Sequence, residues 1–249
     1  MTSKPDGTGT NRTRRRRRAA TPRQLTLELP LAPGLGREDF LVTPANESAF
    51  EAISGWPATP HDPPALALVG PPGSGKTHLA EIWRLEHDAL RATPAELEVE
   101  AVPTLLSRGA LVLEDMPGEK LDETALFHLL NMARQEGANV LLTTTTSPAT
   151  WPVALPDLRS RLAALPFVEI GPPDDELLRA VLVKLFADRQ LLVGDEVVSY
   201  LLLRMERSLT AAQELVAALD KAALSERRRI TRPLAARVLK ELAWREQGG

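Results

Sequence analysis

The sequence GPPGSGKT (residues 70–77) decides the fold of this chain. It matches the pattern G-x-x-x-x-G-K-[ST], whose fixed positions are Gly70, Gly75, Lys76 and Thr77. The apolar run ALALVG (65–70) precedes it, and the helical pattern GKTHLAEIWRLEHDAL (75–90) follows it. Because a strand before and a helix after are the context of a phosphate-binding loop, we interpret the motif as one.

The residue types of this loop suit a phosphate group. Glycines let backbone N–H groups close around phosphate oxygens, and the helix start adds partial positive charge. We expect Lys76 to reach the β- and γ-phosphates and Thr77 to offer its hydroxyl to Mg²⁺. The expected cofactors are therefore ATP or ADP with Mg²⁺. The expected nucleotide-binding residues here are Gly70, Pro71, Pro72, Gly73, Ser74, Gly75, Lys76, Thr77 and His78.

Two further strand ends carry polar side chains. The run ALVLEDM (110–116) contains the acid pair Glu114-Asp115, which suits the carboxylate that a phosphate-binding loop needs near its metal. The run NVLLTTTT (139–146) ends in threonines, which commonly orient water near the γ-phosphate. Thr145 is the favoured candidate for that role. Four consecutive threonines also favour a β conformation, so a purely structural role stays open.

Continuous apolar runs between helical stretches predict an α/β fold with a parallel sheet buried on both faces. Expected strands lie at 65–70, 110–116, 139–146 and 166–170, and the alternating segment ELEVEAV is a candidate fifth at 96–102. Only helices are expected after residue 173, at 174–190, 195–205, 210–227 and 231–245. We predict an α/β nucleotide-binding domain over residues 35–170 and a small helical lid domain over 171–249.

Composition excludes several classes of protein. The chain has no cysteine, which excludes disulfides and thiol chemistry, and its four histidines lack metal-ligand spacing. No apolar run is long enough to span a membrane, and the N-terminus lacks the apolar segment of a secretory signal. We therefore expect a cytoplasmic protein without a membrane partner.

Charge is distributed unevenly along the chain. Residues 1–23 carry +7, and subtracting this from the net −3 leaves −10 for the remainder. We expect a disordered basic tail over 1–23. Its arginine run (12–18) suits contact with nucleic acid or acidic protein, and equally a solvated tail that aids solubility. The acidic remainder argues against direct sequence-specific DNA binding.

The segment QLTLELP (24–30) has leucines on alternate positions, which is typical of an extended strand. It is either an edge strand of the same sheet or a motif for a partner. In a partner's apolar groove each leucine would contribute roughly 1.5–3 kcal/mol. Ordering the segment offsets much of this, so the motif alone should bind weakly.

The order of these motifs resembles the AAA+ domain of the bacterial initiator DnaA over residues 40–239. The acid pair and threonines are followed by LPDLRSRL (155–162), similar to that family's SRF-like segment, and by Pro172-Pro173-Asp174 before the helical stretch. The segment DFLVTPANESAFEAI (39–53) is similar to the part of the family that lies against adenine. The resemblance therefore implies that Phe40 and Leu41 contact the nucleotide.

The resemblance also assigns roles to the acid pair and the lid. The family's metal-side Asp and catalytic Glu are here Glu114 and Asp115, which implies that Glu114 binds the metal with Thr77 and that Asp115 is the base. Asp115 is one methylene shorter than glutamate, so we expect tight nucleotide binding and slow hydrolysis. The lid's sensor arginine falls on Thr210, with Arg204 and Arg207 as alternatives from the previous turn.

A DnaA-like ATPase led by QLTLEL is similar to the Hda family of regulatory inactivators. That family docks such a motif on the DNA polymerase III sliding clamp and then stimulates ATP hydrolysis on DnaA. The resemblance implies that Arg161 is the arginine finger offered to DnaA. It implies that the clamp contacts are Gln24, Leu25, Leu27 and Leu29. Because the chain ends at Gly249, we expect no DNA-binding helix-turn-helix domain, and a homodimer stays open.

Three other functions fit the same motifs. A helicase-loader-like AAA+ factor would share the fold and would make use of the arginine run. A small-molecule P-loop kinase would need an acceptor pocket beside the phosphates. An adaptor that holds ADP only for stability would need no catalysis of its own.

Overall fold

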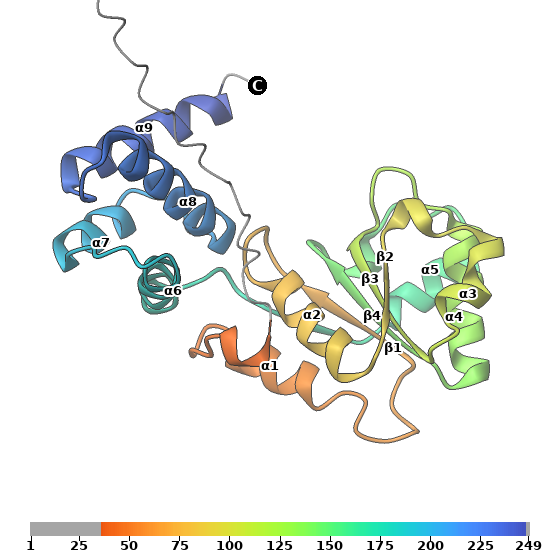
Figure 1. The fold of residues 1–249 in the computed structure, drawn as a ribbon. Helices are drawn as coiled ribbons and strands as arrows, with labels where there is room; N and C mark the ends of the chain where they lie inside the picture. The colour runs from red at the N-terminus through yellow and green to blue at the C-terminus, as the bar shows by residue number, and fades with distance from the viewer. Residues whose placement is uncertain (1–35, 248–249) are drawn as a thin grey trace, which may run out of the picture. The chain divides into compact units, whose positions relative to one another are not determined.

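The computed structural model describes residues 36–247 and contains a five-stranded sheet followed by helices (Figure 1). The strand order is β2-β3-β4-β1-β5, and all four pairings are parallel. The prediction of a parallel α/β sheet is therefore confirmed. The strands are β1 (Ala65–Val69), β2 (Leu90–Ala92), β3 (Ala110–Met116), β4 (Asn139–Thr144) and β5 (Phe167–Glu169).

One predicted strand is wrong. Residues 96–102 run from the end of the 3-10 helix η2 (Pro94–Glu96) through the 3-10 helix η3 (Val99–Ala101) to the start of α3 (Val102–Leu105). The fifth strand is β2 instead. The backbone N–H of Thr93 donates to Glu96 Oε2 at 2.8 Å, which closes the first of these turns. Leu97 is one of the alternating apolar residues that suggest a strand. It follows η2 directly, and its side chain is buried in the core.

Helices cover both faces of the sheet (Figure 1). Helices α1 (Glu47–Ser54) and α2 (Lys76–Glu86) pack on one face, and α3, α4 (Glu123–Glu136) and α5 (Pro156–Ala163) pack on the other. Residues on β3 alternate between the two cores, because successive strand side chains point to opposite faces. All five residues of β1 are buried, as the continuous apolar run indicates.

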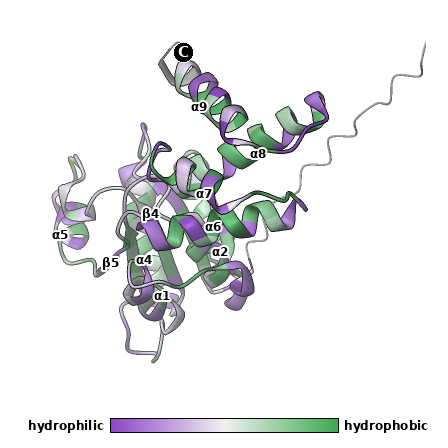
Figure 2. Cartoon of the chain, turned by 90° about the vertical axis from the view of Figure 1, so that its left-hand side faces the viewer, coloured by the Kyte–Doolittle hydropathy of each residue, from purple (hydrophilic) through white to green (hydrophobic). Residues whose placement is uncertain are grey.

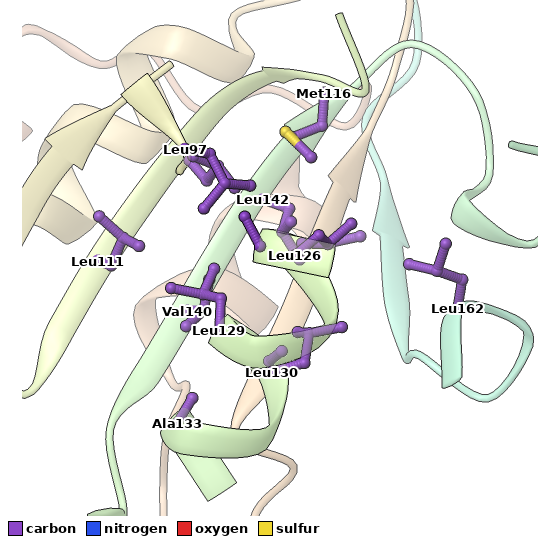
Figure 3. Close-up of a cluster of buried hydrophobic side chains, with 14 of the residues drawn as sticks. Leu97, Leu111, Met116, Leu126, Leu129, Leu130, Ala133, Val140, Leu142 and Leu162 are labelled. Atoms are coloured by element: carbon purple, nitrogen blue, oxygen red, sulfur yellow. The ribbon is translucent and has the colours of Figure 1, made fainter. Parts of the chain in front are cut away.

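Helix α4 has an apolar face toward the sheet, a capping residue at its start and a glycine at its end. Its residues Leu126, Leu129, Leu130 and Ala133 recur at the spacing of one helix face and point toward Val140 and its neighbours on the sheet (Figure 3). Asp122 caps the helix by accepting a hydrogen bond from the Ala125 N–H at 2.9 Å. Gly137 ends it with a φ of +70°, which glycine adopts without steric cost.

The C-terminal part of the chain forms four helices with an apolar core of their own. They are α6 (Asp175–Asp188), α7 (Asp195–Leu202), α8 (Leu209–Glu226) and α9 (Arg232–Gln247), close to the four predicted ranges. Hydrophobic and hydrophilic residues alternate along α8 and α9 (Figure 2), as in amphipathic helices. In the part of the chain that the structure describes, no helix is long and apolar enough to cross a membrane.

Candidate nucleotide-binding site

The loop at residues 70–77 connects β1 to α2 and needs its glycines. Gly73 and Gly75 have φ angles of +68° and +102°, which L side chains rarely adopt. A Cβ on Gly70 would lie 2.5 Å from the carbonyl oxygen of Ile170. The loop conformation therefore excludes larger residues at all three positions.

The loop offers the polar groups that a phosphate would satisfy. Within residues 36–247, the buried Ser74 Oγ has no hydrogen-bond partner. Lys76 Nζ donates to the carbonyl oxygens of Gly70 and Pro71, at 2.8 and 2.9 Å. Burial lowers the pKa of Lys76, and the nearby charge of Asp115 opposes this shift. A phosphate at this helix start would pair with Lys76 and the orphaned hydroxyl, so these residues fit a nucleotide.

The two acids of β3 have different surroundings. Glu114 is only 4% exposed and forms an ion pair with Arg91 of β2. Burial raises the pKa of Glu114, and the Arg91 charge opposes this shift. Asp115 is exposed at a φ of +55°, where the ladder register between β3 and β4 shifts. Glu114 is thus a buried, paired carboxylate, whereas Asp115 is open to solvent.

The threonines of β4 lie between the acids and the loop, because β4 separates β3 from β1. Thr143 Oγ1 accepts a hydrogen bond from the Asp115 N–H at 3.0 Å. Thr144 Oγ1 donates to the Thr146 carbonyl at 2.9 Å. Thr145, the residue favoured from sequence, follows the strand and is exposed. Thr143 therefore contacts the acid pair, while Thr145 is accessible from solvent.

The segment before α1 packs against the start of α2. The Phe40 ring stacks on Phe50 at 5.3 Å between centroids and meets His78 edge-on at 5.1 Å. His78 Nε2 lies 3.2 Å from the Gly36 carbonyl oxygen, and burial lowers the pKa of His78. Leu41 is half-buried, and its carbonyl accepts a hydrogen bond from Asn46 Nδ2 at 2.9 Å. Phe40 and His78 thus meet beside the loop, whereas Leu41 is hydrogen-bonded to Asn46 at the start of α1.

Helix α8 also reaches the loop, a contact that sequence reasoning missed. The Leu209 N–H donates to the Gly73 carbonyl oxygen at 2.8 Å. Ser208 caps α8 by accepting from the Ala211 N–H at 3.2 Å, and a Cβ on Gly73 would lie 2.0 Å from Ser208 Oγ. A serine before a helix is a recognisable cap signal. Its contact with a loop far away in sequence leaves no local signal.

The sequence's resemblance to DnaA assigns the lid's sensor position to Thr210, with Arg204 and Arg207 as alternatives. Thr210 is exposed in the first turn of α8. The Arg204 guanidinium lies over the Tyr200 ring at 4.2 Å, and Arg207 forms an ion pair with Asp175. Both arginines are therefore engaged among the C-terminal helices.

Arg161 lies in the last turn of α5. Its guanidinium carbon is 5.0 Å from the centre of the Phe127 ring. The two residues line a cavity of about 460 Å³ together with Ala65, the first residue of β1. The phosphate loop follows the last residue of the same strand, Val69. Gln24, Leu25, Leu27 and Leu29 lie outside the described residues.

Comparisons with known proteins agree with this architecture. Residues 174–239 match the family model described as "Hda, lid domain". An uncharacterized protein of Haemophilus influenzae is 30% identical over 188 residues, which cover 71% of this chain and 81% of that protein.

Solved structures share the fold. Domain III of the replication initiation protein DnaA from Thermotoga maritima superposes with a TM-score of 0.71 at 20% identity, covering 85% of this chain and 98% of that one. AMPPCP-bound DnaA from Aquifex aeolicus superposes with a TM-score of 0.60 at 20% identity, covering 75% of this chain and 64% of that one. The Thermotoga maritima RuvB branch migration motor superposes with a TM-score of 0.65 at 15% identity, covering 84% of this chain and 72% of that one. Together with the lid match and the Haemophilus relative, these likenesses show that the chain belongs to the Hda family of DnaA-related AAA+ proteins.

Proposed function

We propose that this chain binds the DNA sliding clamp, holds ADP or ATP with Mg²⁺ in its phosphate loop, and stimulates ATP hydrolysis on DnaA. In this proposal Arg161 acts on the nucleotide of the neighbouring DnaA molecule. Such a protein would limit re-initiation of chromosome replication. The observation that carries the proposal is the position of Arg161 relative to the chain's own phosphate loop.

Arg161 and the loop belong to opposite edges of the sheet. Arg161 shares a cavity with Ala65, where β1 begins, and the loop starts after Val69, where β1 ends. At about 3.3 Å per residue, the first and last Cα atoms of this strand are roughly 13 Å apart. Because the strand separates the guanidinium from the chain's own phosphates, Arg161 suits a nucleotide bound by another molecule.

The remaining residues have roles at the chain's own nucleotide. Lys76 and the loop N–H groups would hold the phosphates, and Phe40, Leu41 and His78 would border the base. Thr77 and Glu114 would hold Mg²⁺, whose positive charge would offset the negative charge of the phosphates. Asp115 would orient water, with Thr145 as an accessible partner. Asp115 is exposed and one methylene shorter than a glutamate, which is consistent with slow hydrolysis.

Two features support the choice of partners. The lid match and the DnaA-like fold place the chain among proteins related to DnaA, and one such DnaA is described as bound to AMPPCP. The segment QLTLELP suits an apolar groove on a clamp, and several motifs on a multi-site clamp would raise the avidity. Homodimerisation is a further property that the proposal allows.

A reconstitution tests the proposal. ATP-loaded DnaA is mixed with this chain and with clamp loaded on DNA, and the nucleotide on DnaA is followed over time. We expect conversion to ADP only when both the clamp and this chain are present. A variant with alanine at Gln24, Leu25 and Leu27 should lose clamp binding while keeping its nucleotide affinity. Unchanged hydrolysis on DnaA in the complete mixture would overturn the proposal.

A helicase-loader-like function is the second candidate, and the arginine run at 12–18 favours it. A pull-down with purified clamp and purified replicative helicase separates the two functions. Binding to the helicase alone would support the loader. A small-molecule kinase is disfavoured because Arg161, and the cavity it lines, lie at the edge of the sheet away from the phosphate loop.

A further inference from the structure

The carboxylate proposed to face Mg²⁺ already has a cationic partner from its own chain. Arg91 of β2 forms an ion pair with Glu114 of β3. The side chain of Glu114 is 5% exposed, whereas that of Arg91 is 51% exposed. The pair thus joins a buried acid at the proposed metal site to a guanidinium that reaches in from the surface.

Strand register explains why this pair forms. Arg91 lies opposite Val112 in the parallel pairing of β2 with β3. Glu114 is two residues beyond Val112, so it projects from the same face of the sheet at a diagonal position. Val112 packs in the core beneath α2, the helix that begins at the phosphate loop. The register therefore directs Arg91 toward the acid on the face that carries the nucleotide site.

Two other acids lie within the electrostatic reach of Arg91, and both have partners of their own. Glu81 accepts two hydrogen bonds from the Arg84 guanidinium at 2.7 and 2.8 Å, and Glu96 is hydrogen-bonded within its own turn. These hydrogen bonds lower the pKa of both carboxyls, and the Arg91 charge lowers it further. Arg91 forms its ion pair with Glu114, the buried carboxylate of this cluster.

We propose that Arg91 is a positioning residue that supplies a built-in positive charge at the metal-side acid, so that nucleotide binding by this chain depends little on Mg²⁺. This inference rests on the proposed nucleotide site. An uncompensated carboxylate near the phosphates would repel them whenever the metal is absent. The Arg91 guanidinium reduces that repulsion, because its positive charge lies against the buried carboxylate and offsets the field of Glu114 at the phosphates.

The test compares ADP affinity with Mg²⁺ and with EDTA by isothermal titration calorimetry. For the wild-type chain we expect the dissociation constant to change less than about threefold between the two conditions. For Arg91→Met we expect binding in EDTA to weaken roughly tenfold or more and to recover with Mg²⁺, since one nearby charge is lost. The double variant Arg91→Met/Glu114→Gln removes both charges, so its dissociation constant for ADP should again be similar with Mg²⁺ and with EDTA.

Arg108→Met is the matched control. Arg108 has the same 51% side-chain exposure as Arg91 and pairs with Asp88 instead. It should behave as the wild-type chain does, which separates the loss of this particular charge from the loss of any surface arginine. Thermal melting of each variant without nucleotide establishes that it folds.

The outcomes separate this inference from the proposed function. If ADP binds none of the folded proteins, the nucleotide site itself fails. If ADP binds but the wild-type chain already needs Mg²⁺ as strongly as Arg91→Met does, only the role of Arg91 fails. A wild-type dissociation constant that rises roughly tenfold or more in EDTA contradicts the role of Arg91 even if Arg91→Met does not fold. A metal-independent wild type with a metal-dependent Arg91→Met supports the inference.

Discussion

The guanidinium of Arg161 rests on the ring of Phe127, with 5.0 Å between the guanidinium carbon and the ring centre. Helix α5 supplies the cation and helix α4 supplies the ring. The contact holds the proposed arginine finger on the body of the sheet domain, and no acid among residues 36–247 forms an ion pair with it.

Replacing Arg161 by alanine should abolish the stimulation of ATP hydrolysis on DnaA while leaving folding, nucleotide binding and clamp binding intact. A guanidinium supplied in trans stabilises charge on the γ-phosphate and raises rates by about 10³–10⁵. Arg161→Lys should rescue only partly, because a point charge lacks the planar fork of donors. The reconstituted reaction measures both, and near wild-type stimulation by Arg161→Ala would remove the finger assignment.

Replacing Phe127 by leucine should have a smaller effect on the same reaction. A cation–π contact at an exposed site is worth about 0.5–1 kcal/mol, which corresponds to a roughly two- to fivefold loss of stimulation. The melting temperature should change little, since leucine keeps most of the half-buried apolar contact. If Phe127→Leu lowers stimulation as much as Arg161→Ala, Phe127 has a role beyond supporting the guanidinium.

Replacing Lys76 by alanine should weaken nucleotide binding and remove the thermal shift that ADP produces. A ligand that binds only the folded state at one hundred times its dissociation constant adds about 2.7 kcal/mol of stability. Differential scanning fluorimetry with and without ADP measures this shift. A wild-type melting temperature that ADP leaves unchanged would contradict the phosphate-site assignment.

Replacing Gly73 by alanine should impair both the phosphate loop and its contact with α8. The new Cβ would meet Ser208 Oγ at 2.0 Å, in addition to the strain of a φ of +68°. Gly137→Ala is the matched control, because Gly137 has a φ of +70° and a Cβ added there would meet nothing within 4 Å. The extra loss of ADP affinity and melting temperature in Gly73→Ala therefore measures the clash.

Removing the Ser208 side chain separates the effect of the clash from the effect of the strained φ at residue 73. Gly73→Ala/Ser208→Gly should recover part of the melting temperature that Gly73→Ala loses. Equal losses in Gly73→Ala and Gly137→Ala would show that α8 does not contact the loop in solution.

The free energy of unfolding should fall as the pH drops below the ordinary pKa of histidine, in part because of His78. Burial lowers the pKa of His78 in the folded chain, so the unfolded chain takes up the proton first. Stability from this residue is therefore full above pH 6.5 and is lost as the pH falls through the lowered pKa. Urea unfolding of His78→Gln should show a shallower pH dependence in this range, and parallel profiles would argue against this role.

The sequence alone predicted the phosphate loop, the parallel sheet and the four C-terminal helices. Each of these has a local signal, such as glycines at set spacing, continuous apolar runs, or apolar residues at helical spacing with a capping residue. The similarity to DnaA also followed from motif order, which is a property of the linear chain. The same local reasoning failed at 96–102, where two short turns bury apolar residues at strand-like spacing.

The tertiary structure alone decided which side chains meet. Arg91 reaches Glu114 because of the register between two strands, and Arg161 rests on Phe127 because α4 and α5 pack on the same face. Ser208 closes over Gly73 although the two are far apart in sequence. Periodicity and motifs report on neighbours along the chain, whereas charge compensation and steric fit depend on neighbours in space. The chemistry of this site therefore depends on contacts that only the folded chain creates.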